Sequence, residues 1–551
     1  LASASSEQVV KLEPEAPIVA LAFLAKDRAL LTLGQDKQLL VTEVDKKMRE
    51  DSLPMSIGLQ GLGSEPLQLV VDPTGRRAAV AAKDHKIYVW NLAKRLSFAQ
   101  PVAVLDENRE AVADLVTTRD SNWLLSAGAD GTLRRWNLQN TEAGAGSYAV
   151  TDHEGPISEL ALSADGSTLA IGAHQEDGGS TGIGGDQASN ASPESGAVYV
   201  LVRDGAGTWT QQAYVKASNT DSGDGFGSSV ALSADGSTLA VGAEYEDSFA
   251  TGIGGDQAND ALGNAGATYV FVRDGGGAWS QQAYIKASNP SPDDRFGARV
   301  ELSADGDTLA VGAWLESSSA TGIDGDQANE AADASGAAYV FVRDVLGSWS
   351  QQAYIKASNT SANDWFGLSL DLSADGDTLA VGAMYEDSIA SGIDGDQTDE
   401  SGFNAGAAYV YERNVIGQWT QAAYVKATNP DLHDNFGWDV ALSGDGDVLA
   451  VGAWSEDGSA SGIGGDQADD STSVAGGAYV LVRDGAGAWA HRSYVKASNP
   501  GVNDEFGRSL ALSEDGRALA IGSWQEDGNA TGVGGAQAND LAVNSGAVYL
   551  Y

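Results

Sequence analysis

The sequence predicts an all-β protein, a β-propeller built from repeated four-stranded antiparallel sheets. One stretch returns every 70 residues, with its first residue at Phe226, Phe296, Phe366, Phe436 and Phe506. A degenerate copy stands one period earlier, where Pro156 replaces the phenylalanine. Each copy also contains four short strand patterns. A lone sheet of four strands cannot bury both faces, so neighbouring copies must pack together, and radial packing gives a propeller.

The four predicted strands follow in order within each repeat. In the copy that starts at Phe226, the first strand lies around 230–232 and turns at Asp235-Gly236, a tight-turn signal. The second strand, 238–243, is rich in small residues, which suits strands crowded near the axis of a ring. A loop of about twenty residues follows, and the strands at 267–273 and 279–286 complete the sheet.

The pattern F-G-x-S-V-A-L-S-x-D-G-x-x-L-A-V-G-A resembles the FG-GAP repeat of integrin α-subunit propellers and their bacterial secreted relatives. The resemblance covers about residues 151–551 in six copies. The family's calcium loop carries D-x-[DN]-x-D-G-x-x-D between the first two strands. This chain has only Asp305-Gly306-Asp307 and its equivalents there, too few carboxylates for a site of about six to eight oxygens. The family's calcium loop is therefore not expected.

Residues 15–138 follow a different repeat of 46–48 residues, with copies at 18–42, 67–91 and 112–137. These copies resemble WD40 repeats, in which an apolar strand ends at a Trp-Asp or Trp-Asn pair. Trp90 and Trp136 match that position, whereas Thr42 departs from it. The sequence thus predicts a closing strand and three WD40-like sheets in 1–150, followed by six FG-GAP-like sheets in 151–551.

Both regions are expected to share one continuous ring of about nine sheets. No linker separates them: His153 opens a WD40-like unit that continues as FG-GAP-like residues. The sixth copy stops at its third strand, and Gln8-Val9-Val10-Lys11 resembles residues 213–216 of a fourth strand. We predict that residues 7–13 pair with residues 546–551 and close the ring, which removes an open sheet edge. Two separate rings are the alternative.

Composition narrows the class of partner. The chain has no cysteine and a net charge of −45. Residues 1–150 hold 17 Lys and Arg against 19 Asp and Glu, so −43 of that charge lies in residues 151–551. Such a field disfavours nucleic acid and anionic membranes, and favours divalent cations, basic partners or a salty medium. No apolar run of about twenty residues exists, so membrane insertion is not expected. An export signal is expected to have been removed or left out.

Acidic residues recur at three positions of the repeat, and hard oxygen ligands at these positions favour Ca²⁺. The alternative is that they cap turns and accept hydrogen bonds from loop amides. The candidate metal ligands are the Glu that follows the second strand, the Asp ten residues later, and the Asp two residues before Phe-Gly: Glu176, Glu246, Glu316, Glu386 and Glu456; Asp186, Asp256, Asp326, Asp396 and Asp466; Asp224, Asp294, Asp364, Asp434 and Asp504.

Aromatic and basic residues recur on the predicted fourth strand, at Trp209, Trp279, Trp349, Trp419 and Trp489, each followed by a Tyr and a Lys. An aromatic ladder of this kind suits either carbohydrate stacking or packing between sheets, and half-buried strands favour packing. The lysines are expected to balance nearby carboxylates or protect sheet edges.

No catalytic motif accompanies these repeats. The five histidines occupy unlike repeat positions, without a Ser nucleophile or an H-E-x-x-H pattern. The sequence therefore predicts a non-enzymatic bacterial protein, secreted or on the cell surface, that binds protein partners or copies of itself. The resemblance implies a rigid disc that presents loops, as in adhesion proteins. A carbohydrate-binding propeller, an enzyme with a rim site and an intracellular WD40 scaffold are the alternatives.

Overall fold

The computed structural model describes the strands between residues 18 and 150 and, beyond them, residues 157–205, 209–526 and 547–551. Every regular element in these residues is a strand, and the strands form nine antiparallel sheets. None of the described segments is a helix that is long and apolar enough to cross a membrane.

Three sheets precede residue 151. They contain β1 (Ile18–Leu24), β2 (Ala29–Gly34), β3 (Gln38–Glu43) and β4 (Met55–Gly58); β5 (Pro66–Val71), β6 (Arg77–Ala82), β7 (Ile87–Asn91) and β8 (Ala103–Leu105); and β9 (Val112–Thr117), β10 (Trp123–Gly128), β11 (Leu133–Asn137) and β12 (Ala149–Val150). The first three strands of each sheet coincide with the predicted WD40-like copies to within one residue, and the fourth strand begins 12 or 13 residues after the end of the copy.

Four further sheets share one plan. They contain β13 (Glu159–Leu162), β14 (Thr168–Ala173), β15 (Ala197–Arg203) and β16 (Trp209–Val215); β17 (Val230–Leu232), β18 (Thr238–Ala243), β19 (Ala267–Arg273) and β20 (Trp279–Ile285); β21 (Arg299–Leu302), β22 (Thr308–Ala313), β23 (Ala337–Arg343) and β24 (Trp349–Ile355); and β25 (Leu370–Leu372), β26 (Thr378–Ala383), β27 (Ala407–Arg413) and β28 (Trp419–Val425).

The last two sheets vary this plan. They contain β29 (Phe436–Leu442), β30 (Val448–Ala453), β31 (Gly462–Ile463), β32 (Gly477–Arg483) and β33 (Trp489–Lys496); and β34 (Phe506–Leu512), β35 (Leu519–Ser523) and β36 (Ala547–Leu550). The four-strand prediction for the repeat is confirmed almost to the residue. The predicted closing strand, residues 7–13, lies outside the described residues.

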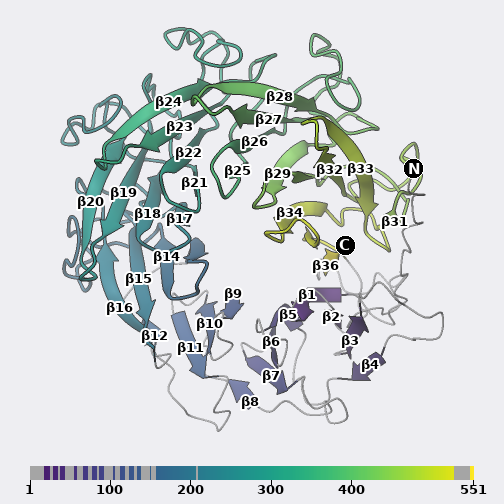
Figure 1. Ribbon diagram of the computed structural model, residues 1–551, viewed down its shortest axis with the longest axis horizontal. Coiled ribbons are helices and arrows are strands. Elements are labelled where there is room, and N and C mark those ends of the chain that lie inside the picture. The colour runs from purple at the N-terminus through teal and green to yellow at the C-terminus, as the bar shows by residue number, and fades with distance from the viewer. Residues whose placement is uncertain are drawn as a thin grey trace.

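The sheets are arranged radially around a common centre (Figure 1). The first strands of consecutive sheets lie beside one another, as β17 lies beside β21. The first strand is therefore innermost and the fourth is outermost. The first and last sheets also meet, because β1 lies beside β36, the third described strand of the last sheet. The second strand lies next to the innermost one, and its small residues allow close contacts between sheets. A Cβ atom on Gly312 of β22 would overlap the carbonyl oxygen of Gly367, which belongs to the next repeat.

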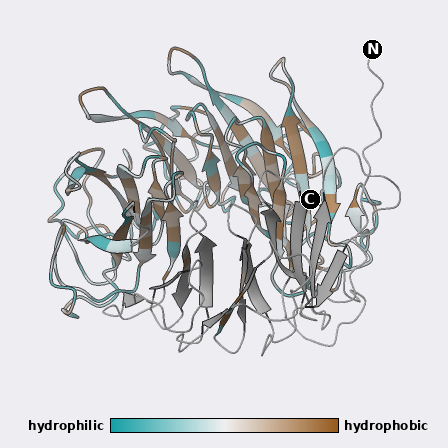
Figure 2. Ribbon diagram, turned by 60° about the horizontal axis from the view of Figure 1, so that its bottom comes forward, coloured by the Kyte–Doolittle hydropathy of each residue, from teal (hydrophilic) through white to brown (hydrophobic). Residues whose placement is uncertain are grey.

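The hydrophobic core lies between neighbouring sheets, and Figure 2 shows apolar residues concentrated along the strands. Phe296 packs with Ile285 of the preceding sheet and with Tyr339 of its own, the two ring centroids lying 5.2 Å apart. Phe296 and its counterparts are fully buried, which explains why the Phe-Gly pair recurs. Gly336 (φ +80°) lies against the backbone of Phe366, where any side chain would clash.

Backbone hydrogen bonds also join the sheets in sequence. In five successive repeats, an amide in the turn after the first strand donates to the carbonyl of the equivalent residue 70 positions on, as Ala234 N does to Ala304 O at 2.8 Å and Ala304 N does to Ala374 O at 2.8 Å. The tight turn thus satisfies its own backbone and fixes the spacing of the sheets.

Candidate functional site

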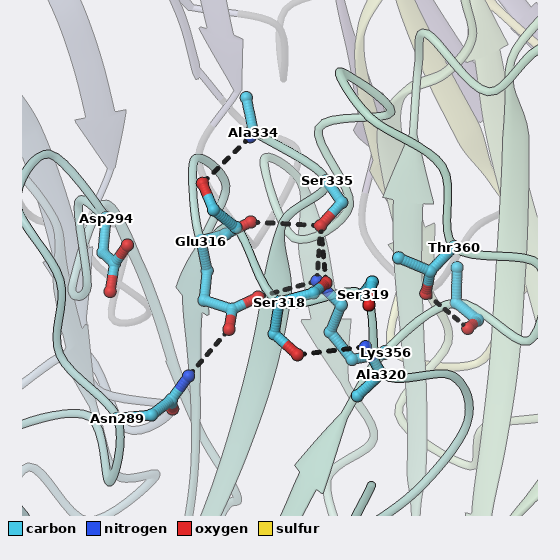
Figure 3. A network of polar contacts seen from close by, with 12 residues as sticks. Asn289, Asp294, Glu316, Ser318, Ser319, Ala320, Ala334, Ser335, Lys356 and Thr360 are labelled. Carbon is cyan, nitrogen blue, oxygen red and sulfur yellow. Dashed lines mark hydrogen bonds and ion pairs between the residues drawn. The ribbon is translucent and has the colours of Figure 1, made fainter. Parts of the chain in front are cut away.

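A buried ion pair recurs in five of the described sheets, and Figure 3 shows the one formed by Glu316 and Lys356. Glu316 follows β22 and Lys356 follows β24. Lys356 Nζ lies 2.6 Å from Glu316 Oε2, and the two side chains are 0% and 1% exposed. Burial lowers the pKa of Lys356, whereas the Glu316 carboxylate raises it.

The other carboxylate oxygen of Glu316 extends the network to the preceding sheet. Tyr354 Oη donates to Glu316 Oε1 at 2.8 Å, and Asn289 Nδ2, from the loop after β20, donates to the same atom at 2.7 Å. Asn289 Oδ1 in turn accepts from Tyr339 Oη at 2.8 Å. Both oxygens of the carboxylate are therefore hydrogen-bonded, and a satisfied polar network of this kind rigidifies the junction between two sheets.

The same network repeats along the chain. The equivalent ion pairs join Glu176 to Lys216 at 3.0 Å, Glu246 to Lys286 at 2.7 Å, Glu386 to Lys426 at 2.6 Å, and Glu456 to Lys496. The equivalent amide contacts run from Asn219 to Glu246, from Asn359 to Glu386, from Asn429 to Glu456 and from Asn499 to Glu526. The expectation that the lysines balance carboxylates holds for these pairs.

The aspartates of the long loop have a different role. Asp326 is exposed, and its Oδ1 accepts from the amide of Ala328 at 3.0 Å, which caps a turn. The same contact, two residues along the chain, is made by Asp186, Asp256, Asp396 and Asp466.

The aspartates before Phe-Gly form a third group. Asp294 is 1% exposed, and its Oδ2 accepts from the amide of Ser291 at 2.6 Å. Figure 3 shows it on a loop to one side of Glu316. Asp224, Asp364, Asp434 and Asp504 make the same turn contact. Burial raises the pKa of Asp224 and Asp294 to about 8, that of Asp364 to about 9, and that of Asp434 well above its usual range.

The three sets of predicted metal ligands thus make two kinds of contact: the glutamates pair with lysines, and both sets of aspartates accept hydrogen bonds from nearby amides. No group of three or more His, Asp or Glu side chains in the described ranges is arranged to hold a metal ion. The glutamates already face a lysine ammonium, which a hard cation would have to displace. Calcium binding stays an untested prediction, and turn capping, the alternative, describes the contacts of both sets of aspartates.

The first turn of the repeat also uses its carboxylate internally. Asp305 Oδ1 accepts from Ser303 Oγ at 2.6 Å and from the amide of Asp307 at 2.9 Å. These bonds are those of a self-contained turn.

The outer tryptophans pack between sheets. Trp349 is 7% exposed, and its Nε1 donates to Gln282 Oε1 of the preceding sheet at 2.8 Å. The guanidinium carbon of Arg343 lies 5.5 Å from the centroid of the same ring. A ring enclosed in this way offers no face to a sugar, so this ladder does not support a carbohydrate site.

Sequence reasoning missed a group of charged side chains on the innermost strands. Asp371 Oδ2 accepts from the amide of Leu442, 2.7 Å away on the next first strand, and Asp439 Oδ2 accepts from Leu510 N at 2.8 Å. Arg299 lies 3.4 Å from Glu159. Most other repeats have Ser or Ala at these positions. A charged residue in place of Ser or Ala was therefore the signal in the sequence that could have identified this group. The two aspartates thus accept hydrogen bonds from edge amides of the inner strands.

The buried aspartates predict a specific pH dependence. Their carboxyls bind a proton more tightly in the folded chain than in the unfolded chain, where the pKa is about 4. Each carboxyl therefore contributes its full stabilisation below pH about 4. As the pH rises above about 4, the free energy of unfolding falls by about 1.4 kcal/mol per pH unit for each carboxyl, until the pH reaches the pKa of the folded chain. Thermal melting from pH 5 to pH 9 should show this loss.

The matched variants are Asp224→Asn, Asp294→Asn and Asp364→Asn combined, against the exposed Asp326→Asn. The triple variant should lose less stability than the parent chain over this range, and the control should follow the parent. Equal slopes in the triple variant and the parent would show that these carboxyls are ionised throughout.

Comparisons with known proteins agree with the repeat assignment. The FG-GAP repeat family matches residues 209–271, 279–341, 349–411 and 419–481, a narrower region than the predicted 151–551. The WD domain, G-beta repeat family matches residues 99–137, which contain the third of the predicted copies. The comparison with curated proteins returns no match.

Solved propellers are among the structural neighbours. The chain is similar to the β-propeller domain of Cps50 (Swd1) from Myceliophteria thermophila at 15% identity, with a TM-score of 0.31, over 53% of this chain and 78% of that one. It is similar to the Dos1 propeller at 10% identity, with a TM-score of 0.42, over 80% of this chain and 90% of that one. The family matches, together with the radial sheets, identify the chain as a β-propeller that carries FG-GAP repeats within residues 209–481 and a WD40 repeat at residues 99–137.

Proposed function

We propose that this protein is a non-catalytic platform, secreted or on the cell surface, that binds a protein partner or further copies of itself. The observation that carries the proposal is the repeated junction: the same buried Glu–Lys–Tyr–Asn network joins one sheet to the next along the FG-GAP region. Chemistry at a single site needs one unique constellation, whereas identical junctions favour a rigid disc that displays its loops.

The proposal includes a single closed ring of about nine sheets. The position of β1 beside β36 supports it. The last sheet has three described strands. We propose that residues 7–13 supply the fourth, because Gln8-Val9-Val10-Lys11 aligns with residues 213–216 and places Lys11 at the position of Lys216. Such a strand would join the first and last segments of the chain in one sheet.

Charge asymmetry suggests how copies associate. Residues 1–150 are close to neutral, whereas residues 151–551 carry −43. A head-to-tail contact between the two arcs relieves repulsion that would arise between two acidic arcs. This association is expected to weaken with salt, because exposed charges are screened over about 8–10 Å at physiological ionic strength.

The test is light scattering of the intact chain over a concentration series at about 0.05 M and about 0.5 M salt. We expect reversible association at low salt that reverses at high salt. Changing Lys46, Lys47, Lys94 and Arg95 to Glu should abolish it, and the exposed control Arg517→Glu should not. A chain that is monomeric under all conditions and retains no cell-surface protein on a column would contradict the proposal.

A further inference from the structure

The repeats differ from one another mainly along one rim. The Phe-Gly pair and the Leu-Ala pair of the second strand are kept, but the position just after the second strand changes from Glu244 to Trp314, Met384, Trp454 and Trp524. Two residues after the repeat Phe, Ala298 and Leu368 give way to Trp438 and Arg508. The first strand begins and the second strand ends on the same rim, so these varied side chains gather there.

Four of these side chains form one group: Trp438, Trp454, Arg508 and Trp524. Asn435 adjoins them, because its carbonyl oxygen accepts from the amide of Trp438 at 3.2 Å, and the five residues are here called the Trp454 cluster. The centroids of Trp438 and Trp454 lie 5.7 Å apart. The guanidinium carbon of Arg508 lies 5.0, 5.3 and 4.0 Å from the ring centroids of Trp438, Trp454 and Trp524. Trp524 is 62% exposed, so the cluster reaches the surface.

Two polar atoms of the cluster have no hydrogen-bond partner among the described residues. Asn435 is 5% exposed, and its Nδ2 donates to the carbonyl of His433 at 2.9 Å, but its buried Oδ1 accepts nothing. Trp454 Nε1 is also buried and donates to nothing. A buried polar group without a hydrogen-bond partner lowers the stability of the fold by about 1–3 kcal/mol. Most buried polar groups in folded proteins therefore have a partner.

We propose that the Trp454 cluster is a binding site for a neutral carbohydrate. The C–H face of a sugar ring packs on an exposed indole ring, here that of Trp524, and its hydroxyl groups both donate and accept. One hydroxyl donates to Asn435 Oδ1 and another accepts from Trp454 Nε1. An apolar surface with a few polar atoms that fix orientation is the usual composition of a small-ligand site.

The cluster also excludes two other ligand classes. The charge of −43 in residues 151–551 disfavours anionic ligands. Arg508 forms an ion pair with Glu505 and its guanidinium faces three rings, so a positive charge is already held here and would repel a cationic side chain of a partner but not an uncharged sugar. The proposal is independent of the platform function, because a sugar can bind here whether or not copies associate.

The test uses the full chain on an array of neutral hexasaccharides (β-1,4-glucose, β-1,4-N-acetylglucosamine, α-1,4-glucose and β-1,4-xylose), with an alginate hexamer and an oligolysine peptide as charged probes. Calorimetry and tryptophan fluorescence follow on the best binder. We expect at least one neutral glycan to bind and to shift the fluorescence. Trp524→Ala should weaken binding at least tenfold, since it removes an exposed ring without disturbing the core.

The matched control is Phe403→Ala, which removes an aromatic side chain of similar exposure, 57%, from a loop of another sheet. It should leave binding unchanged. Asn435→Asp keeps the size of the side chain and should alter which glycan binds. Binding by no neutral glycan, equal binding by the Trp524→Ala variant, or stronger binding of a charged probe would each overturn the proposal. Light scattering of the Trp524→Ala variant measures self-association separately. Loss of glycan binding with unchanged light scattering therefore concerns the sugar site and not the association of copies.

Discussion

Lys356→Met is expected to lower the free energy of unfolding by about 3–5 kcal/mol, because it leaves the Glu316 carboxylate buried without its cation. Glu316 also accepts hydrogen bonds from Tyr354 and from Asn289 of the preceding sheet. The loss should therefore weaken a junction between sheets as well as one sheet. Chemical denaturation followed by tryptophan fluorescence measures it.

A second variant separates the charge from the packing. Glu316→Gln combined with Lys356→Met removes both charges, and a glutamine still accepts from Tyr354 and Asn289. This double variant should recover most of the stability, since replacing a buried ion pair with neutral groups of similar volume is often nearly neutral. The exposed pair of Arg343 and Asp307 supplies the control, and Asp307→Asn should cost less than about 1 kcal/mol. Equal losses in the single and double variants would show that packing, not charge, is the cause.

Deletion of residues 1–13 is expected to lower the free energy of unfolding by about as much as Lys356→Met does, if these residues close the ring. The equivalent residues of a fourth strand, Tyr214 and Val215, are 1% and 0% exposed. Burying side chains of this size stabilises a fold by about 1.5–3 kcal/mol each, so the loss should be about 3–6 kcal/mol. The exposed edge of β36 should also promote aggregation. Thermal melting and light scattering report the two effects.

The control is deletion of residues 1–6 alone, which leaves the proposed strand in place and should change neither readout. Lys11→Met tests the same idea within the full chain. If Lys11 pairs with Glu526, as Lys216 pairs with Glu176, its loss should be as costly as Lys356→Met. A 1–13 deletion that melts like the parent chain would rule out closure by this segment.

Local pattern sufficed to predict the strands. The strand at 267–273 and its partner at 238–243 were predicted to the residue, because alternation, small residues and the Asp235-Gly236 turn act over a few positions. The 70-residue period likewise predicted that neighbouring copies pack together, since one four-stranded sheet cannot bury its own faces.

Local sequence patterns could not predict which residues the polar side chains contact. Glu316 and Lys356 are 40 residues apart, Asn289 and Glu316 are 27 apart, and Trp349 lies 67 residues from Gln282. The recurring acidic positions looked alike in the sequence, yet Glu316 is paired, Asp294 is buried and Asp326 is exposed. The sequence by itself determined the strands, their period and the sign of the charge, because these depend on neighbours along the chain. Only the tertiary structure decided which carboxylates meet a lysine and which tryptophans reach the surface, because that depends on how one sheet docks against the next.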